Sequence, residues 1–518
     1  MSKNKSVMSH QFSQVPKAEI QRSSFDRSHG VKTTFDGGWL VPILVDEALP
    51  GDTFNCKLTG FARLATPIFP LMDNMFMETF FFSVPNRLLW DNWQKFNGEQ
   101  TNPGDSTDFT IPTITSPSGG YLEQTLYDYL GIPTKITGLI HSALWNRAYN
   151  LIYNEWFRDE NLQTSVAHIT SDSAANPANY VLLQRGKRHD YFTSALPWPQ
   201  KGVAVQLPLG NTAPIMGLAW DQGGTSATDP VLETARGAVT YGISGNVVGE
   251  LFGGPASPGF YADLSQATGA TINALRQSFQ IQKLLERDAR GGSRYTEIIR
   301  AHFNVVSSDQ RLQRPEYLGG GSSPIGISQV AQTTSTDATS PQGNLAAFGT
   351  ATLHNHGFTK SFTEHCTIIG LINVRADLTY QQGLNRMWSR QTRYDFYWPA
   401  LSQIGEQSIL NKEIWADGTA NDETVFGYQE RYAEYRYKPS TITGLFRSNA
   451  TATLDAWHLS QDFASVPTLN STFIEDTPPI DRVIAVPAEP HFLFDGYFDM
   501  RCARPMPLFG VPGNMDRF

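Results

Sequence analysis

The alternation of apolar and polar residues predicts long β-strands near both ends of the 518-residue chain. Residues 51–64 and 74–85 are aromatic and β-branched runs bounded by Gly, Pro and Asn. Residues 366–380 alternate between apolar and polar side chains, which predicts a strand with one buried face. Residues 491–505 alternate in the same way, so we expect the chain to end on a core strand.

Two other stretches have a helical period. Between residues 121 and 162, apolar side chains recur at helical spacing, at Ile140, Leu144, Ala148, Leu151 and Ile152. A second stripe begins at Ile272 and ends at Gly291-Gly292, where a left-handed helix cap is easily formed. Ser293 is then expected to cap a short helix that runs to Phe303. The pattern therefore predicts a corner between two helices.

Charged side chains crowd this predicted corner. They are Lys283, Glu286, Arg287, Asp288, Arg290, Arg294 and Glu297. The favoured interpretation is that they pair with one another or are solvated, since exposed helical charges usually do no more. A phosphate cradle is excluded, because the Gly-Gly-Ser step lacks the lysine of a P-loop.

Two glycine-rich passages interrupt the strand pattern. Residues 201–262 contain mostly Gly, Ala, Thr, Ser and Pro, with scattered aromatic residues. Loops longer than about 15 residues are usually functional when they are ordered, so this stretch is predicted to be a surface insertion. Residues 319–352 are predicted to be an extended surface connection. Without a dividing linker, residues 1–518 are expected to form one mainly β domain, a β-sandwich with large insertions.

Composition and charge limit the function classes. Only 17% of residues are charged against 40% hydrophobic, which suggests that much of the surface faces other protein. The net charge of -9 excludes a wholly basic nucleic-acid-binding protein. Residues 1–35 nevertheless carry six basic and two acidic residues, a net +4 that leaves -13 for the rest. This basic N-terminal arm is the better candidate for contact with nucleic acid.

Compartment and redox state follow from what the sequence lacks. Cys56, Cys366 and Cys502 are odd in number and far apart, so they are predicted to be core thiols in a reducing compartment. No apolar run approaches the roughly 18 residues of a membrane span, and the N-terminus lacks a signal-peptide pattern. We therefore expect a soluble chain made in the cytoplasm, with no membrane insertion.

Enzyme motifs are absent or wrongly spaced. Pro324 stands where a dinucleotide fingerprint beginning at Gly319 requires glycine, and the chain has neither a GxSxG elbow nor an HExxH pair. His354, His356, His365 and Cys366 are weighed as a metal site. The structural alternative is favoured, because Cys366 belongs to the apolar face of a predicted strand. No catalytic residue, cofactor or metal site is predicted.

The stretch YQERYAEYRYKP, residues 428–439, alternates tyrosines with basic residues. Such alternation can stack single-stranded bases. The favoured interpretation is a half-buried element in which Glu430 and Glu434 pair with arginines, because unpaired acids would repel phosphate.

Several long blocks of sequence carry a specific resemblance. They are ETFFFSVPNRLLWDNWQKFNGE, FQIQKLLERDARGGSRYTEIIRAHF, RLQRPEYLGGG, RADLTYQQGLNRMWSRQTRYDFYWPAL and GYQERYAEYRYKPSTITGLFRS. From about Phe35 to Pro512, the chain resembles the major capsid proteins of gokushoviruses, small single-stranded DNA phages of the microvirus family. The resemblance is weakest between residues 201 and 262, where members of this family differ most from one another.

The resemblance implies a structural protein with an eight-stranded antiparallel jelly-roll β-sandwich of the viral capsid type. Sixty copies would form a T=1 icosahedral capsid around circular single-stranded DNA, in a virion assembled in the bacterial host cytoplasm. The insertion would rise at the threefold axes and recognise the host. Its candidate residues for that role are Trp220, Phe252, Phe260 and Tyr261.

The resemblance also implies partners. Besides itself and the single-stranded DNA genome, the chain would work with an internal scaffolding protein, a pilot protein, a small basic DNA-packaging protein and a host cell-surface receptor. Candidates to face DNA are Lys3, Lys5, Lys17 and Arg22. Candidates for subunit contact are Glu286, Arg287, Asp288, Arg290 and Arg294. The alternative is a β-sandwich glycan-binding module or glycan-active enzyme with a large surface loop, which would remain a monomer or small oligomer.

Overall fold

The computed structural model describes residues 21–205, 272–337 and 341–509, together with the backbone of four short strands between them. These strands are β8 (Ile215–Met216), β9 (Val231–Thr234), β10 (Gly237–Thr240) and β11 (Tyr261–Ala262). The chain divides into two compact units, one from Gln200 to Gly291 and the other from the residues on either side. The smaller unit contains α4 (Ile272–Gly291) and the strand pairs β10-β9 and β11-β8.

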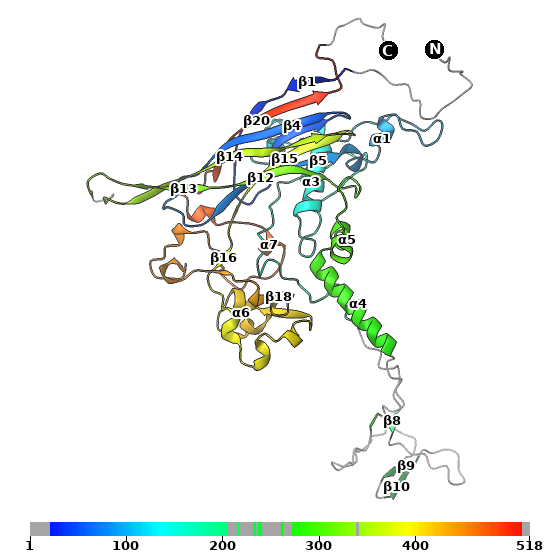
Figure 1. Cartoon of the computed structure of the whole chain (residues 1–518), viewed down its shortest axis with the longest axis vertical. Coiled ribbons are helices and arrows are strands. Elements are labelled where there is room, and N and C mark those ends of the chain that lie inside the picture. Colours follow the sequence, from blue (N-terminus) through cyan, green and yellow to red (C-terminus); the bar gives the residue numbers. More distant parts are fainter. Residues whose placement is uncertain are drawn as a thin grey trace, which may run out of the picture. The chain divides into compact units, whose positions relative to one another are not determined.

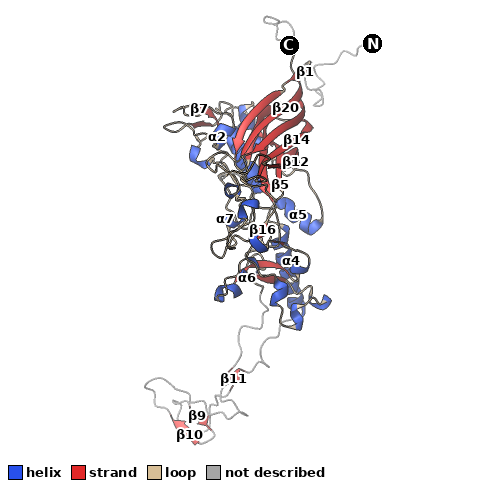
Figure 2. Cartoon of the chain, turned by 90° about the vertical axis from the view of Figure 1, so that its left-hand side faces the viewer, coloured by secondary structure: helices blue, strands red, loops and turns tan. Residues whose placement is uncertain are grey.

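The larger unit is built on two antiparallel sheets, whose strands lie against one another in Figures 1 and 2. One sheet has the order β1-β20-β4-β14-β13, with β2 also paired to β20, and the other has the order β12-β5-β15-β3. The strands are β1 (Ser23–Asp26), β2 (His29–Phe35), β3 (Val41–Ala48), β4 (Thr53–Leu64), β5 (Met75–Pro85), β12 (Glu316–Pro324), β13 (Gly326–Ala331), β14 (Leu345–Ser361), β15 (Cys366–Ala376) and β20 (Phe492–Arg504). The predicted mainly β sandwich is confirmed.

The first and last strands of the sandwich lie side by side. Strand β20 pairs with β4 from Phe492↔Leu64 to Ala503↔Thr53, and on its other side with β1 and β2. Figure 1 shows this neighbourhood as blue β1 against red β20. The prediction of core strands near both ends of the chain is confirmed, and both ends belong to one sheet.

Alternating side chains fill the space between the sheets. Every second residue of β4 and β20 is buried, so each strand contributes one apolar face. The largest buried rings of this core include Phe35, Phe54, Phe81, Phe492 and Phe498. Burying one such side chain stabilises the folded state by about 1.5–3 kcal/mol.

The three thiols also belong to this core, as predicted. Cys56, Cys366 and Cys502 are free and buried. Burial raises the pKa of Cys56 and of Cys366 to about 12, so both remain protonated thiols at neutral pH.

Strand β15 differs from its prediction because both of its faces are buried. Its second face carries Ile369 and Leu371, which belong to a further apolar cluster with Tyr149 of helix α3 (Leu144–Ile152). The helix covers the face that the sequence pattern assigned to solvent. The prediction of a helix here holds for α3, but Ile140 was wrongly included in it, since Ile140 begins strand β7 (Ile140–Ser142) and is exposed.

The prediction of an extended surface connection over residues 319–352 was wrong for most of this stretch, and only the described residues 332–337 and 341–344, between β13 and β14, connect strands. Residues 319–331 and 345–352 form most of β12, all of β13 and the first half of β14. Glycine permits this packing, because a Cβ on Gly320 would lie 2.0 Å from the carbonyl oxygen of Thr79. At Ile325, whose N–H donates to the Met75 carbonyl at 2.9 Å, the chain passes from one sheet to the other.

Short elements cover the ends of the sandwich. The helices are α1 (Trp93–Phe96), α2 (Leu126–Tyr129), α5 (Tyr295–Phe303), α6 (Asn411–Ile414) and α7 (Ser471–Ile474), and the strands are β6 (Thr113–Thr115), β7 (Ile140–Ser142), β16 (Thr379–Tyr380), β17 (Glu406–Leu410), β18 (Val425–Glu430) and β19 (Ser440–Thr441). A third apolar cluster, with Ile409 and Phe426 of β17 and β18, supports a lobe beside the sandwich. Within the described ranges, every helix is too short or too polar to cross a bilayer.

Strand β2 lies at the edge of its sheet, and its hydrogen bonds can be assigned by alternation. The Arg27 N–H donates to the Met500 carbonyl at 2.8 Å, whereas the Thr34 carbonyl accepts from the Tyr129 hydroxyl at 2.9 Å. In an antiparallel pair, residues alternate between bonding the partner strand and facing away from it. Odd-numbered residues therefore bond β20, while Gly30 and Lys32 turn their backbone groups outward.

This alternation predicts opposite effects of proline at two neighbouring positions. Thr33→Pro removes an N–H that faces Phe494 in β20, and should lower the free energy of unfolding by about 1–3 kcal/mol. Lys32→Pro removes an N–H that faces outward and should cost less than about 1 kcal/mol. Urea unfolding of the purified chain measures both values, and equal losses would contradict the assignment.

Candidate functional site

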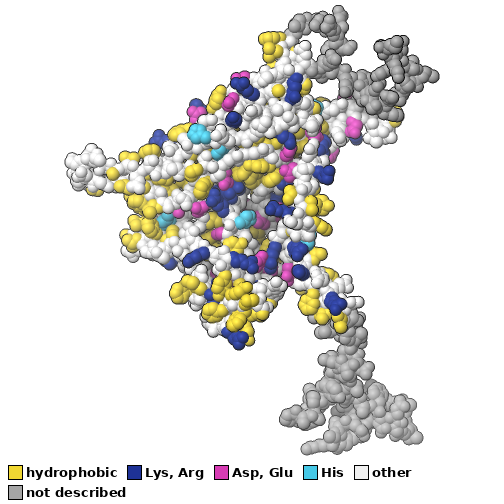
Figure 3. Space-filling view, viewed as in Figure 1, with side chains coloured by type: hydrophobic (Ala, Val, Ile, Leu, Met, Phe, Trp, Pro, Cys, Tyr) yellow, Lys and Arg dark blue, Asp and Glu magenta, His cyan; other side chains and the backbone are white. Residues whose placement is uncertain are grey.

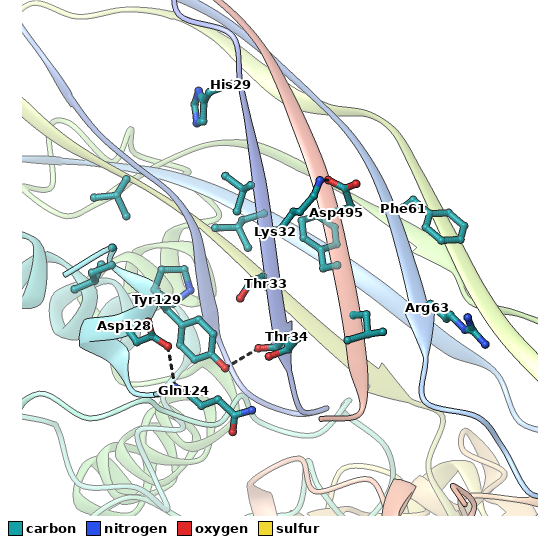
Figure 4. A pocket seen from close by; sticks show the side chains of 18 residues that line it. His29, Lys32, Thr33, Thr34, Phe61, Arg63, Gln124, Asp128, Tyr129 and Asp495 are labelled. Carbon is teal, nitrogen blue, oxygen red and sulfur yellow. Dashed lines mark hydrogen bonds and ion pairs between the residues drawn. The ribbon is translucent and has the colours of Figure 1, made fainter. Parts of the chain in front are cut away.

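A pocket of about 870 Å³ opens where the edges of the two sheets meet. Figure 4 shows β2 and β20 beside the Gln124 to Tyr129 segment, with the Tyr129 hydroxyl directed at the Thr34 carbonyl. Lys32 pairs with Asp495 at 2.9 Å, so the cation on this edge is already neutralised. The outward backbone groups of β2 can accept an extended segment of another chain as an added strand.

The edge of the other sheet reaches the same pocket. Pro42, Ile43 and Val45 of β3 line it, and β3 is the last strand of the four-stranded sheet. Pro42 has no N–H and therefore cannot donate to an incoming strand. An extended partner is thus expected to pair with β2 while its side chains contact β3.

The basic-arm candidates are only partly described. Lys3, Lys5 and Lys17 lie outside the described residues. Arg22 lies beside the sheet, where its guanidinium donates to the Thr53 hydroxyl and to the Ala503 carbonyl. Contact of these four residues with DNA stays a prediction.

The second half of the predicted arm is integrated in the sandwich. Residues 23–26 and 29–35 form β1 and β2, and Arg27 between them forms a two-point ion pair with Asp46, at 2.7 and 2.9 Å. The Asp46 side chain is almost fully buried. Arg27 therefore holds the N-terminal edge to β3 and is not a free cation.

The insertion candidates fall mostly outside the described residues. This applies to Trp220, Phe252 and Phe260. Tyr261 lies in β11, where its backbone pairs with Met216 of β8. Their predicted role in host recognition remains a prediction.

The predicted helix corner is present, with one correction. Helix α4 ends at Gly291, and Gly292 adopts the left-handed conformation with φ of 94°. The N-cap of α5 is Arg294, not Ser293, and its N–H donates to the Glu297 carboxylate at 3.2 Å. Ser293 instead donates its backbone N–H to Glu160 at 2.6 Å.

Arg294 is engaged inside its own subunit. Its side chain is only 16% exposed, and its Nε lies 2.8 Å from Oε1 of Glu160. Its Nη2 also donates to the carbonyls of Asn154 and Arg158, at 2.7 and 2.9 Å. Burial raises the pKa of Glu160, and Arg294 opposes that rise. The arginine therefore anchors the start of α5 to the loop after α3.

The other four corner candidates lie on α4. Glu286 accepts a hydrogen bond from the Gln282 side chain at 2.9 Å, and Asp288 is half-buried. Arg287 and Arg290 are exposed. These two side chains are the best placed of the five for contact with another subunit, and that contact remains a prediction.

The structure also contains a buried charge cluster that the sequence did not predict. Glu78 of β5 accepts from Arg185 and, at 2.9 Å, from Arg375 of β15. Burial acts to raise the pKa of Glu78, but the two arginines outweigh it and lower the pKa. Asp476, 2% exposed, lies near the same cations, and burial raises its pKa to about 7. The cluster joins segments far apart in sequence, so no local motif marks it.

Two of the three histidines weighed as metal ligands have other partners, and the third, His354, is exposed. His356 is buried between the hydroxyls of Thr79 and Ser323, at 2.9 and 3.0 Å, and burial lowers its pKa. The His365 ring packs edge-on against Trp93. Within the described part of the chain, no three His, Cys, Asp or Glu side chains are grouped to hold a metal ion.

The tyrosine-rich stretch 428–439 is half-buried, as the favoured interpretation proposed. Glu430 pairs with Arg436, and Glu434 pairs with Arg390 at 3.5 Å. Tyr432 is buried, whereas Tyr435 is half-exposed. The acids are therefore neutralised, while part of the aromatic surface remains accessible.

The raised pKa of Asp476 predicts a pH-dependent stability. Its folded pKa of about 7 exceeds its unfolded value of 3.8, so the folded state holds more protons between these values. Stability from this group is complete below about pH 4 and falls as the pH rises to about 7. Asp476→Asn removes this loss, and its free energy of unfolding relative to wild type should rise by about 2 kcal/mol from pH 5 to pH 8.

Urea midpoints at the two pH values measure this difference. Asp495→Asn, at a position whose side chain is 59% exposed, is the matched control and should show no comparable rise. A difference that is the same at both pH values would contradict the assignment.

Comparisons with known proteins agree with the fold and with the lack of catalytic motifs. The family model described as Capsid protein (F protein) matches residues 13–514. The chain is 51% identical to capsid protein VP1 of Bdellovibrio phage phiMH2K, over 98% of each chain. It is 47% identical to capsid protein VP1 of Chlamydia phage 1 over 98% of each chain, and 38% identical to that of Spiroplasma virus 4 over 97%. These matches confirm the resemblance seen in the sequence blocks.

Proposed function

The chain belongs to the phage capsid protein (F protein) family, and on that basis we propose that sixty copies form a T=1 icosahedral shell around circular single-stranded DNA. It is a structural protein of the virion and not an enzyme. The match of 51% identity along nearly the whole chain carries the proposal, because the relative is itself a capsid protein. The glycan-binding alternative has no support in these matches. Assembly in the bacterial host cytoplasm is part of the proposal.

An eight-stranded jelly roll is the inferred form of the sandwich. Strands β1 and β2 pair successively with one partner, β20, and β13 continues β12 after Ile325. If β1 and β2 are counted as one strand, and β12 and β13 as one strand of the second sheet, each sheet has four strands. The first then consists of β1 with β2, β20, β4 and β14, and the second of β12 with β13, β5, β15 and β3. This arrangement supports the double-sheet architecture of viral capsid jelly rolls.

The proposed assembly requires surfaces that repeat around each symmetry axis. Heterologous contacts close into rings only when each subunit offers two complementary patches. The open edge of β2 and the exposed Arg287 and Arg290 of α4 are candidates for such patches. The low charged fraction of 17% supports extensive contact between subunits, since charged residues are depleted in interface cores.

We assign host recognition to the insertion at residues 201–262, as a protrusion at the threefold axes. The division of the chain supports this proposal, because the insertion falls within a separate compact unit. A separate unit can change its surface without altering the core of the sandwich. The host cell-surface receptor, the internal scaffolding protein, the pilot protein and the small basic DNA-packaging protein are the proposed partners.

Co-expression with the scaffolding protein tests the shell proposal. Negative-stain microscopy should show uniform closed shells, whereas a glycan-binding module would give monomers or small oligomers. Reversal of Arg287 and Arg290 to Glu should abolish shells but leave soluble folded subunits, because both side chains are exposed. The control is Lys57→Glu with Arg501→Glu, which makes the same charge change on exposed positions of β4 and β20 and should leave shell yield near wild type. Normal shell yields from the α4 variant would refute the proposed contact.

Truncation tests the proposed DNA-facing arm. The deletion must stop at residue 20, because a longer one enters β1 at Ser23 and damages the sheet. Removal of residues 1–20 takes away Lys3, Lys5 and Lys17, and should lower packaged DNA while shell yield stays near wild type. Nuclease-protected DNA per particle is the measurement, and unchanged packaging would exclude the arm.

A further inference from the structure

A second pocket, of about 720 Å³, opens beside Asp36, the residue that follows β2. We call it the aromatic pocket, because its lining includes the rings of Trp39, Tyr121, Tyr127, Tyr129 and Tyr180. Its volume is typical of ligand pockets, which measure roughly 300–1,000 Å³. Tyr121 and Tyr127 stack face to face with 3.8 Å between ring centroids. This wall is therefore formed before any partner binds, which lowers the entropy cost of binding.

Internal hydrogen bonds already use the tyrosine hydroxyls on two sides of this pocket. The Tyr127 hydroxyl donates to the Pro177 carbonyl at 2.8 Å, and the Tyr129 hydroxyl donates to the Thr34 carbonyl at 2.9 Å. Among the described residues, by contrast, no acceptor bonds the indole N–H of Trp39. The aromatic pocket therefore combines apolar rings with a free donor.

The rim of the aromatic pocket is apolar as well. Leu122 and Val181 line it and are 63% and 54% exposed. Its charged lining residue is Asp36, whose carboxylate accepts the His491 N–H at 3.0 Å and whose side chain stays 41% exposed to water. Within the described part of the chain, no Lys or Arg lines the pocket, so a phosphate or a nucleic acid is not the expected occupant.

The C-terminal end of the chain carries a matching apolar segment. Residues 505–509, PMPLF, follow β20, and Met506, Leu508 and Phe509 are 44%, 57% and 79% exposed. Figure 3 shows hydrophobic side chains at the upper tip of this unit, beyond the end of β20. The two prolines have no N–H, so this segment cannot pair as an ordinary strand, but its carbonyls can accept hydrogen bonds. Aromatic-lined grooves are a common binding site for proline-containing segments.

This segment is too far from the aromatic pocket of its own subunit to enter it. The pocket adjoins Phe35, which pairs with Phe492 at the start of β20. The segment leaves after Arg504, at the other end of this 13-residue strand, which is about 40 Å long. Residues 505–509 span at most about 18 Å when fully extended. They can therefore enter only the pocket of another copy.

We propose that the aromatic pocket of one subunit binds residues 505–509 of a second copy of the chain. Leu508 and Phe509 lie against the rings, and the Trp39 N–H donates to a carbonyl of the bound segment. Pocket and segment lie at opposite ends of β20, so the contact is heterologous, and every subunit offers both halves of it. Repeated contacts of this kind can close into rings. This inference rests on the proposed shell and names one of its subunit contacts.

Binding of a fluorescent peptide with the sequence of residues 504–518 to the purified full-length chain tests the proposal. Fluorescence anisotropy should rise to saturation with the wild-type chain. Phe509→Ala in the peptide should weaken binding at least about tenfold, because the ring no longer leaves water. Trp39→Phe in the chain should weaken binding about fivefold, because it keeps a ring but removes the donor.

A substitution at the rim tests the pocket without entering the core. Val181→Asp should weaken peptide binding about tenfold, because it places a carboxylate against the apolar segment. Val486→Asp is the matched control, since Val486 is also 54% exposed and lies outside the pocket lining, and it should bind as wild type. Urea midpoints near that of wild type confirm that both variants are folded. Equal affinity of Val181→Asp and wild type would overturn the proposal.

Disulfide trapping shows which copy supplies the segment. A chain with both Val181→Cys and Leu508→Cys, co-expressed with the scaffolding protein and then oxidised, should give a ladder of linked chains on a non-reducing gel. Each single variant should give no ladder, since Cys56, Cys366 and Cys502 are buried. A link formed only within one chain, or no link in assembled particles, would overturn the proposal.

The failures of this contact and of the proposed function can be told apart. If the wild-type chain forms shells but does not bind the peptide, the shell proposal stands and this contact is refuted. If Val181→Asp blocks shells while peptide affinity is unchanged, the pocket receives a different partner and the contact is again refuted. If the wild-type chain forms no shells in co-expression, the proposed function is contradicted, whatever the peptide affinity.

Discussion

The sandwich depends on the pairing of its last strand, β20, which lies between strands from the N-terminal part of the chain. Strand β20 bonds β4 along one side and β1 with β2 along the other. The sheet therefore cannot close until the C-terminal residues have been made, and each pair spans more than 400 residues of sequence. Such non-local pairing folds slowly, because loop-closure entropy is lost before the contacts compensate for it. Everything between the two ends must fit as loops, helices or inner strands around a sheet that closes last.

Charge is distributed to suit such a fold. Arg185, Arg294 and Arg375 are largely buried and bind carboxylates or carbonyls of their own subunit. Arg294 joins the start of α5 to the loop after α3, while Arg185 and Arg375 both bind Glu78 of β5. Only 17% of all residues are charged, so each cation that is paired inside the subunit leaves fewer charges for its outer surface. A protein that must contact many neighbours gains from this arrangement, since fewer charges have to be desolvated at each contact.

The sequence predicted those strands whose apolar and polar positions reflect packing against a single neighbouring layer. Strand β20 was predicted because one of its faces is buried and the alternation records this directly, whereas β4 and β5 were predicted from aromatic and β-branched runs bounded by turn residues. Strand β15 was predicted to have one buried face, but both of its faces are buried, because α3, which is distant in sequence, covers the second face. The Gly319 to Thr352 strands were missed because glycine composition resembles that of a loop. Only the close approach of the Thr79 backbone explains the glycine there.

The candidate sites were predicted less well, for related reasons. The helix corner was predicted from its glycines, but its cap was placed one residue early, because Arg294 is fixed by contacts with Glu160 and not by local propensity. The Glu78 cluster has no local signal at all. The exposed rings of residues 386–404 were not predicted, because aromatic composition does not say which side chains face solvent.

The glycines of β12 have an evolutionary consequence. At Gly320 the close neighbour is a backbone oxygen, and at Gly321 it is the ring of a histidine bonded on both sides. No rearrangement of side chains can make room beside a carbonyl that belongs to the next strand. A phage population that samples every single-nucleotide change should therefore purge nearly all substitutions at Gly320. Codons for many surface residues can change, whereas the codon for Gly320 should stay unchanged, because any Cβ there would overlap the Thr79 carbonyl oxygen.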